Sequence, residues 1–87
     1  MKLTLLTRAY CGLCAEMEAA VRPQAVAAGV PVVVLDVDAD PALEAAWGDL
    51  VPVLFAGEPG RGGEICHYRL DRAGLEAALA RIRRQGD

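Results

Sequence analysis

Two cysteines three positions apart are the residues of this sequence best suited to chemistry. Cys11-Gly12-Leu13-Cys14 forms a C-x-x-C motif. Residues three apart on a helix share one face, so the two sulfurs can meet there. A thiol at a helix N-terminus also faces unpaired backbone N–H groups and the positive end of the helix dipole, which favour the thiolate. The motif therefore predicts Cys11 as the attacking thiol and Cys14 as the resolving thiol.

Two residues just before the motif are candidates for substrate binding. Arg8 is either a positive charge near the Cys11 sulfur or a solvated loop arginine. Tyr10 either forms a flat apolar wall beside the substrate sulfur or covers the end of the helix. The sequence leaves both pairs of alternatives open.

The sequence around the motif predicts a strand, a loop and then a helix. Residues 2–7 are rich in Leu and Thr and suit a strand, and apolar residues recur every four positions from Leu13 to Ala25. Pro23 falls inside this helix and is expected to kink or divide it, and Gly29 is a natural end. A C-x-x-C at a strand–loop–helix junction in a short βαβ pattern favours redox chemistry over metal binding.

The second half of the chain predicts three strands and one short helix before the last helix. Residues 30–35 form a nearly unbroken, valine-rich apolar run, typical of a strand covered on both faces. A short helix follows over residues 41–48, with Pro41 suited to its first turn. Residues 51–55 and 64–69 predict an antiparallel hairpin joined by a glycine-rich loop.

The last helix has the clearest start signal in the sequence. Asp71 suits the N-cap, and Leu70 and Leu75 occupy the two positions of a hydrophobic staple. The order of elements is then β-α-β-α-β-β-α. We expect one α/β domain over residues 1–87, with the first two strands parallel, the hairpin on one side of them and helices on both faces of a four-stranded mixed sheet.

Composition restricts the classes of partner. The net charge is −3, from 12 acidic and 9 basic residues, which argues against a nucleic-acid partner. No apolar run reaches the length of a signal-peptide core or of a membrane span, so we expect a cytoplasmic protein with no membrane partner. Three cysteines are too few, and odd in number, for a secreted disulfide framework.

Metal sites are weaker interpretations of the same residues. Asp36, Asp38 and Asp40 alternate as in a calcium loop, but Pro41 and Trp47 stand where glycine and glutamate are needed. We therefore predict no bound calcium.

Cys66 and His67 could join the C-x-x-C in a zinc site only if both pointed the same way, and neighbouring residues of a strand do not. Cys66 is better explained as a small buried apolar residue and His67 as a surface histidine. We predict no metal ligands, and an iron–sulfur cluster shared between two chains through Cys11 stays as an alternative.

A family resemblance extends this interpretation. The run Ala-Tyr-Cys-Gly-Leu-Cys over residues 9–14, followed later by Val51-Pro52-Val53, resembles the thioredoxin superfamily and within it the small glutaredoxin-like proteins of bacteria. The resemblance covers essentially the whole chain and implies a thioredoxin-like, glutaredoxin-type fold. It also implies a cis proline at Pro52 opposite the cysteines, with the backbone of Val51 facing an extended peptide or glutathione. Arg8 matches the cation often found three residues before the first cysteine.

The chain departs from the glutaredoxin pattern at two places. Gly12 and Leu13 replace the usual Pro-Tyr between the cysteines, and residues 69–71 read Arg-Leu-Asp where many members have a Gly-Gly pair that helps to hold a glutathione carboxylate. Whether glutathione binds is therefore left open by the sequence.

The expected function is dithiol–disulfide oxidoreduction. The Cys11 thiolate would attack a disulfide of a protein or of glutathione, and Cys14 would resolve the mixed disulfide. No bound cofactor is then required, and the candidate reductants are glutathione, a thioredoxin reductase and a dedicated partner. Two alternatives are an iron–sulfur cluster module that uses the same cysteines and a redox-inert scaffold that holds a partner strand near Pro52.

Overall fold

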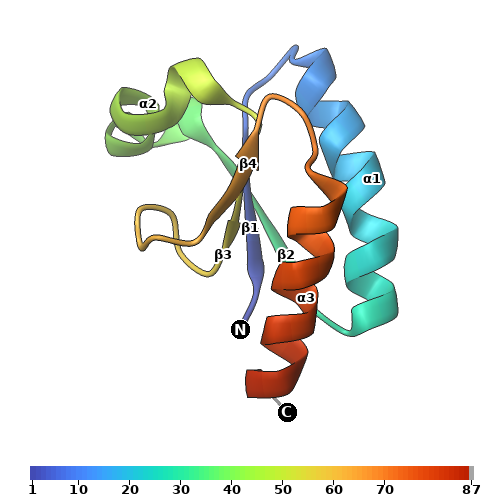
Figure 1. Ribbon diagram of the computed structural model, residues 1–87. Helices are drawn as coiled ribbons and strands as arrows, with labels where there is room; N and C mark the ends of the chain where they lie inside the picture. The colour runs from blue at the N-terminus through green and yellow to red at the C-terminus, as the bar shows by residue number, and fades with distance from the viewer. Residues whose placement is uncertain (87) are drawn as a thin grey trace.

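In the computed structural model, which describes residues 1–86, the chain forms a four-stranded sheet with helices on both faces (Figure 1). Residue 87 of the predicted domain lies outside the described residues. The elements in chain order are β1 (Leu3–Thr7), α1 (Gly12–Ala28), β2 (Val32–Asp36), the 3₁₀ turn η1 (Val37–Ala39), α2 (Pro41–Trp47), the 3₁₀ turn η2 (Gly48–Leu50), β3 (Val53–Ala56), β4 (Glu64–His67) and α3 (Arg72–Gly86). This order confirms the predicted α/β fold class.

The strands lie in the order β2-β1-β3-β4. β1 pairs in parallel with β2 and antiparallel with β3, and β3 pairs antiparallel with β4. The hairpin therefore lies on one side of the parallel pair, as predicted. Because Leu6 pairs with Val53, the last residues of β1 and the first residues of β3 lie at the same end of the sheet. The loop to the cysteines begins at this end.

The valine-rich strand contacts both apolar layers but is buried less than its sequence predicted. β2 is an edge strand whose residues are half-buried or exposed. β1 and β3 are the two central strands, and in β1 residues Leu3–Leu6 are almost fully inaccessible. β2 starts at Val32 because Pro31 has no N–H to donate, although its carbonyl accepts the N–H of Leu3 at 2.9 Å.

The side chains of β1 divide between two apolar layers. Leu3 and Leu5 pack against α1 and α3 in the larger cluster, whereas Leu6 packs in a second cluster on the opposite face. In the second cluster Trp47, at the end of α2, meets Phe55 edge to face with ring centroids 5.0 Å apart. The sheet is thereby fixed between α2 on one face and α1 and α3 on the other (Figure 1).

Helix α1 continues through Pro23 as one helix, so of the two expected outcomes, a kink or a division, the division does not occur. The carbonyl that loses its partner, on Ala19, lies with Pro23 on the exposed face of the helix, where water can bind it. The buried side chains Cys14, Met17 and Val21 hold the helix on the sheet through this stretch. The helix ends as predicted at Gly29, which adopts the left-handed conformation with φ 72°.

Helix α3 begins as its sequence predicts. The Asp71 carboxylate accepts the N–H of Gly74 at 2.9 Å, and Leu70 packs against the cluster that contains Leu75. Within residues 1–86, no helix is both long and apolar enough to span a membrane.

Candidate functional site: the Cys11–Cys14 pair and the Val51–Pro52 loop

The two cysteines of the motif lie at the start of α1 and form a disulfide, with their Cα atoms 5.2 Å apart. Cys11 is the N-cap residue, with extended backbone dihedrals of φ −110° and ψ 106°. Its Sγ accepts the backbone N–H of Cys14 at 3.1 Å. Cys14 lies one turn further on and is only 3% exposed, whereas Cys11 is half-buried. A substrate can therefore reach the Cys11 sulfur more easily than the Cys14 sulfur.

The first turn of α1 suits an anion at Cys11. It contains no acidic residue, so no carboxylate neutralises the positive end of the helix dipole. The sulfur of Cys11 occupies the place that a Ser or Asp side chain takes at an ordinary N-cap. The same backbone donor that caps the helix thus also stabilises negative charge on this sulfur.

The Val51–Pro52 loop enters the site from the neighbouring strand. The peptide bond between Val51 and Pro52 is cis, as the family resemblance implied. β3 begins at Val53 and not at residue 51, the start predicted from the apolar pattern. Pro52 is buried and Val51 is half-buried, and the Pro52 carbonyl accepts the N–H of Tyr68 at 2.9 Å. The register of β1 and β3 places this loop at the same end of the sheet as the loop to Cys11.

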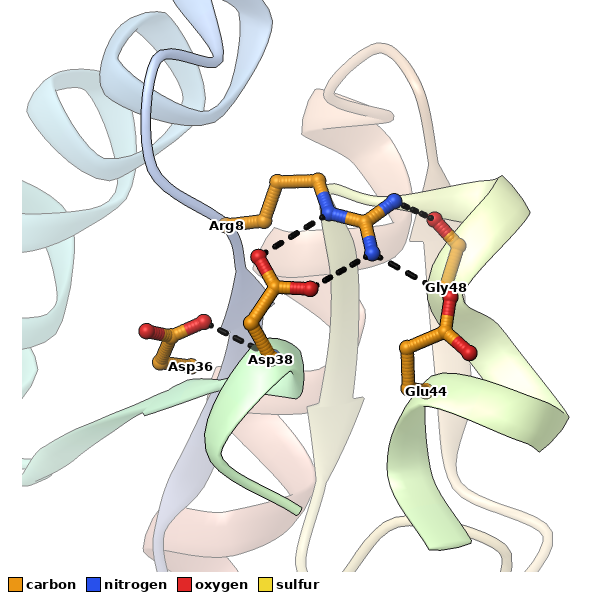
Figure 2. A network of polar contacts seen from close by, with 5 residues as sticks. All are labelled: Arg8, Asp36, Asp38, Glu44 and Gly48. Atoms are coloured by element: carbon orange, nitrogen blue, oxygen red, sulfur yellow. Dashed lines mark hydrogen bonds and ion pairs between the residues drawn. The ribbon is translucent and has the colours of Figure 1, made fainter. Parts of the chain in front are cut away.

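Arg8 is held by polar groups of η1, α2 and η2. Its guanidinium binds Asp38 through Nε (3.3 Å) and Nη2 (2.7 Å), Glu44 through Nη2 (3.2 Å) and the carbonyl of Gly48 through Nη1 (3.1 Å), as Figure 2 shows. No hydrogen bond or ion pair within residues 1–86 joins it to Cys11. Its charge is directed to the α2 side of the site.

The contacts between Arg8 and Asp38 shift the pKa values of both side chains. Hydrogen bonds to Asp38 and Glu44 raise the pKa of the Arg8 guanidinium above its ordinary value. The hydrogen bond from Arg8 in turn lowers the pKa of Asp38 below its ordinary value. Both groups are therefore charged at neutral pH.

Two tyrosines at the site have left-handed backbones. Tyr10 (φ 59°) and Tyr68 (φ 64°) are the only non-glycine residues with positive φ within residues 1–86. Tyr10 is fully exposed beside Cys11, a position that suits the predicted wall for a substrate. Tyr68 was not identified from the sequence, because nothing in its local sequence signals a left-handed residue. It also ends β4 at His67, two residues before the predicted end.

A pocket of about 340 Å³ opens beside the motif, between α1 and the segment that links β4 to α3. Leu13 and Met17 line it from α1, and Tyr68 and Leu70 line it from the linking segment. Leu13 stands between the two cysteines in the sequence, so the pocket is continuous with the start of α1. The charged residues Glu16, Arg69 and Arg72 line it as well, so the pocket is of mixed polarity.

The third cysteine has a different environment. Cys66 is half-buried on β4 opposite Leu54 and packs against the larger apolar cluster. Burial raises the pKa of its thiol. His67 is exposed and bonds through Nδ1 to Glu64 at 2.8 Å. The two neighbours thus differ in environment, as expected for successive residues of a strand.

These features define the class: a thioredoxin-like fold with a disulfide-forming cysteine pair at the first helix and a cis proline at the neighbouring strand, suited to redox-type function. Residues 2–80 match the model of the family described as Glutaredoxin-like domain (DUF836), and the chain therefore belongs to this family.

Two solved structures are similar to this chain. Protein Ne2328 from Nitrosomonas europaea, solved by solution NMR, is similar with a TM-score of 0.72 and 34% sequence identity over 87% of each chain. Thioredoxin 1 from Thermosipho africanus matches with a TM-score of 0.64 over 94% of this chain and 93% of its own. At 19% identity, that second match shows the fold alone. No curated protein matches the chain.

Proposed function

We propose that this protein is a dithiol–disulfide oxidoreductase that reduces mixed disulfides of proteins or of glutathione. The observation that carries the proposal is the unequal placement of the two sulfurs. Cys11 is accessible and accepts a backbone N–H at the start of α1, whereas Cys14 is buried one turn below and within bonding distance. A nucleophile and a resolving thiol need this difference in access and acidity.

The reaction consists of two thiol–disulfide exchanges. The Cys11 thiolate attacks one sulfur of the substrate disulfide, a new S–S bond forms to Cys11, and the other substrate sulfur leaves as a thiolate. The Cys14 thiolate then attacks the Cys11 sulfur and releases the second substrate thiolate. The substrate gains two electrons and the protein ends with the Cys11–Cys14 disulfide. A thiol reductant, such as glutathione or a reductase, returns the pair to the dithiol.

The remaining groups support binding. Val51 presents an extended backbone beside Pro52, with φ −63° and ψ 145°, which suits pairing with an extended peptide or with glutathione. Tyr10 would flank the bound sulfur. The redox equivalents are carried by the two cysteines themselves, so the proposal requires no prosthetic group. We further propose that the protein acts in the cytoplasm, where a C-x-x-C pair can cycle against a reducing thiol pool.

A trapping experiment tests the roles of the cysteines. The Cys14→Ser variant should form a mixed disulfide with a glutathionylated peptide, and reducing agent should release it. Cys11→Ser should form none, and Cys66→Ser, the matched cysteine control, should turn over as the unaltered protein does. Trapping at Cys66, or none at Cys11, would refute the proposal.

A comparison of reductants identifies the electron source. Peptide disulfide reduction is measured with NADPH and either glutathione plus glutathione reductase or thioredoxin reductase alone. Activity with the first system alone would identify a glutathione-dependent enzyme. A coloured protein with stoichiometric iron after anaerobic purification would instead support the cluster module.

A further inference from the structure

The η2 turn, Gly48–Leu50, directly precedes the Val51–Pro52 loop and is held by two side chains from distant parts of the chain. Arg8 donates to the carbonyl of Gly48 at 3.1 Å, and Tyr68 Oη donates to the carbonyl of Asp49 at 2.9 Å. We infer that Arg8 and Tyr68 are positioning residues that fix the Val51–Pro52 loop against the Cys11–Cys14 pair. This inference rests on the proposed function, which uses that loop to bind substrate.

Arg8 connects the cysteine loop to the turn through several elements. It lies between β1 and the start of α1, three residues before Cys11. Its Nη1 reaches the Gly48 carbonyl while Nε and Nη2 hold Asp38 in η1, and Nη2 also meets Glu44 in α2 (Figure 2). A planar guanidinium can make these contacts together because its donors point in several fixed directions. A lysine ammonium cannot reproduce this set.

The acceptors of Arg8 are held in place themselves. Asp38 is fixed at its backbone, because its N–H donates to Asp36 Oδ1 at 2.9 Å (Figure 2). The Glu44 side chain folds back over Gly48, where a Cβ would lie 2.6 Å from Glu44 Oε2. Gly48 is buried and, because it has no Cβ, it leaves room for the Glu44 carboxylate in this position. The geometry therefore favours one orientation of Arg8 toward the turn.

Tyr68 holds the same segment from the β4 side by two bonds. Its phenol donates to the Asp49 carbonyl, and its backbone N–H donates to the Pro52 carbonyl at 2.9 Å. The two acceptors lie on either side of Val51. The left-handed backbone of Tyr68 is unfavourable for a non-glycine residue and persists only where surrounding contacts support it. Here it lets one residue make both bonds to the loop.

The consequence is a division of roles around the cysteines. Cys11 takes its charge stabilisation from the start of α1, whereas Arg8, engaged by two carboxylates, acts on the position of the loop. A loosened loop would bind an extended substrate less well without changing the acidity of Cys11. The inference therefore predicts a rise in KM with kcat and the thiolate titration nearly unchanged.

The test compares Arg8→Lys, Arg8→Gln and Tyr68→Phe in the full-length protein. Lys at position 8 keeps the positive charge but lacks the planar set of N–H donors of the guanidinium, and Phe at position 68 removes only the phenolic hydroxyl. We expect each variant to raise KM for a glutathionylated peptide three- to tenfold, about 0.7–1.4 kcal/mol at the standard conversion, with kcat within twofold. Arg22→Gln, which breaks only the ion pair with Glu18 on α1, is the matched control and should leave KM unchanged.

Two readouts that need no substrate accompany the kinetics. Hydrogen exchange at the Tyr68 amide, whose acceptor is the Pro52 carbonyl, should accelerate in the Arg8 variants. The exchange rate of the Gly57 amide, which donates to the Lys2 carbonyl at the opposite end of the sheet, should not change. The pH at which the Cys11 thiolate forms, followed by ultraviolet absorbance of the reduced protein, should also stay constant.

The outcomes separate this inference from its alternatives. If Arg8→Lys behaves as the unaltered protein while Arg8→Gln shifts the thiolate titration, Arg8 acts by its charge on Cys11 and the inference is overturned. Unchanged Tyr68 exchange in both Arg8 variants overturns it as well. If the unaltered protein reduces no disulfide, the proposed function fails, and the exchange data still decide whether Arg8 positions the loop.

Discussion

Cys11 has two roles that substitution can separate, since it is both the N-cap of α1 and the predicted nucleophile. Its Sγ is the side-chain acceptor at the first turn of α1, taking the N–H of Cys14 at 3.1 Å. Serine is a good N-cap residue and alanine a poor one, with a typical difference of about 1 kcal/mol within a range of about 0.5–2. Neither can form the disulfide. Cys11→Ser and Cys11→Ala should therefore be equally inactive and differ in stability.

The size of the difference follows from how α1 is held. Its buried face, with Met17, Val21 and Ala25, packs on the sheet whatever occupies the cap, so the loss is confined to the first turn. Cys11 itself is only half-buried, so the cap lies near the surface of the protein. We therefore expect about 1 kcal/mol and not the upper limit, equivalent to roughly 4–8 °C in Tm for a domain of this size.

The assay is urea unfolding of both variants in reducing buffer, together with turnover of a glutathionylated peptide. Cys11→Gly is an internal control, since glycine at an N-cap costs only a few tenths of a kcal/mol relative to serine. The expected order of stability is Ser, Gly, Ala, with equal denaturant slopes. Equal stability of Ser and Ala would refute the capping argument, and turnover by either would refute the assignment of the nucleophile.

Three further predictions concern other sites. Gly63→Ala should lower the free energy of unfolding in urea by about 1–3 kcal/mol, because a Cβ at position 63 would lie 2.1 Å from the backbone carbonyl oxygen of Ala56 in β3. Gly12→Ala is the control and should not lower it, because the space around a Cβ at position 12 is open. Arg8 lowers the pKa of Asp38. The stability that the Arg8–Asp38 pair contributes is therefore complete above the ordinary carboxyl pKa of 3.8 and is lost as the pH falls through the lower pKa of the folded state. Acid unfolding of Arg8→Gln should lack this loss. Burial raises the pKa of Cys66, so iodoacetamide at neutral pH should label Cys11 of the reduced protein before Cys66. Mass spectrometry identifies the labelled cysteine, and preferential labelling of Cys66 would contradict this prediction.

The sequence by itself determined the order of the elements and the chemistry of the motif. Asp71 and Gly29 mark a helix start and a helix end, because capping depends on residues within one turn. The C-x-x-C lies at a strand–helix junction for the same local reason. The glutaredoxin-like resemblance added the cis proline, which local pattern alone does not predict.

Tertiary structure decided which distant groups meet. Sheet order explains why β1 is fully buried and β2 only half-buried, because a short apolar run gives the same sequence pattern in a central strand and in an edge strand. The partners of Arg8 lie 30 to 40 residues away in the chain, and Tyr68 reaches a carbonyl 19 residues away. Such contacts arise only when the sheet brings the ends of β1, β3 and β4 together. Periodicity and capping act over a few residues, so they place the cysteines on a helix and leave their surroundings to the fold.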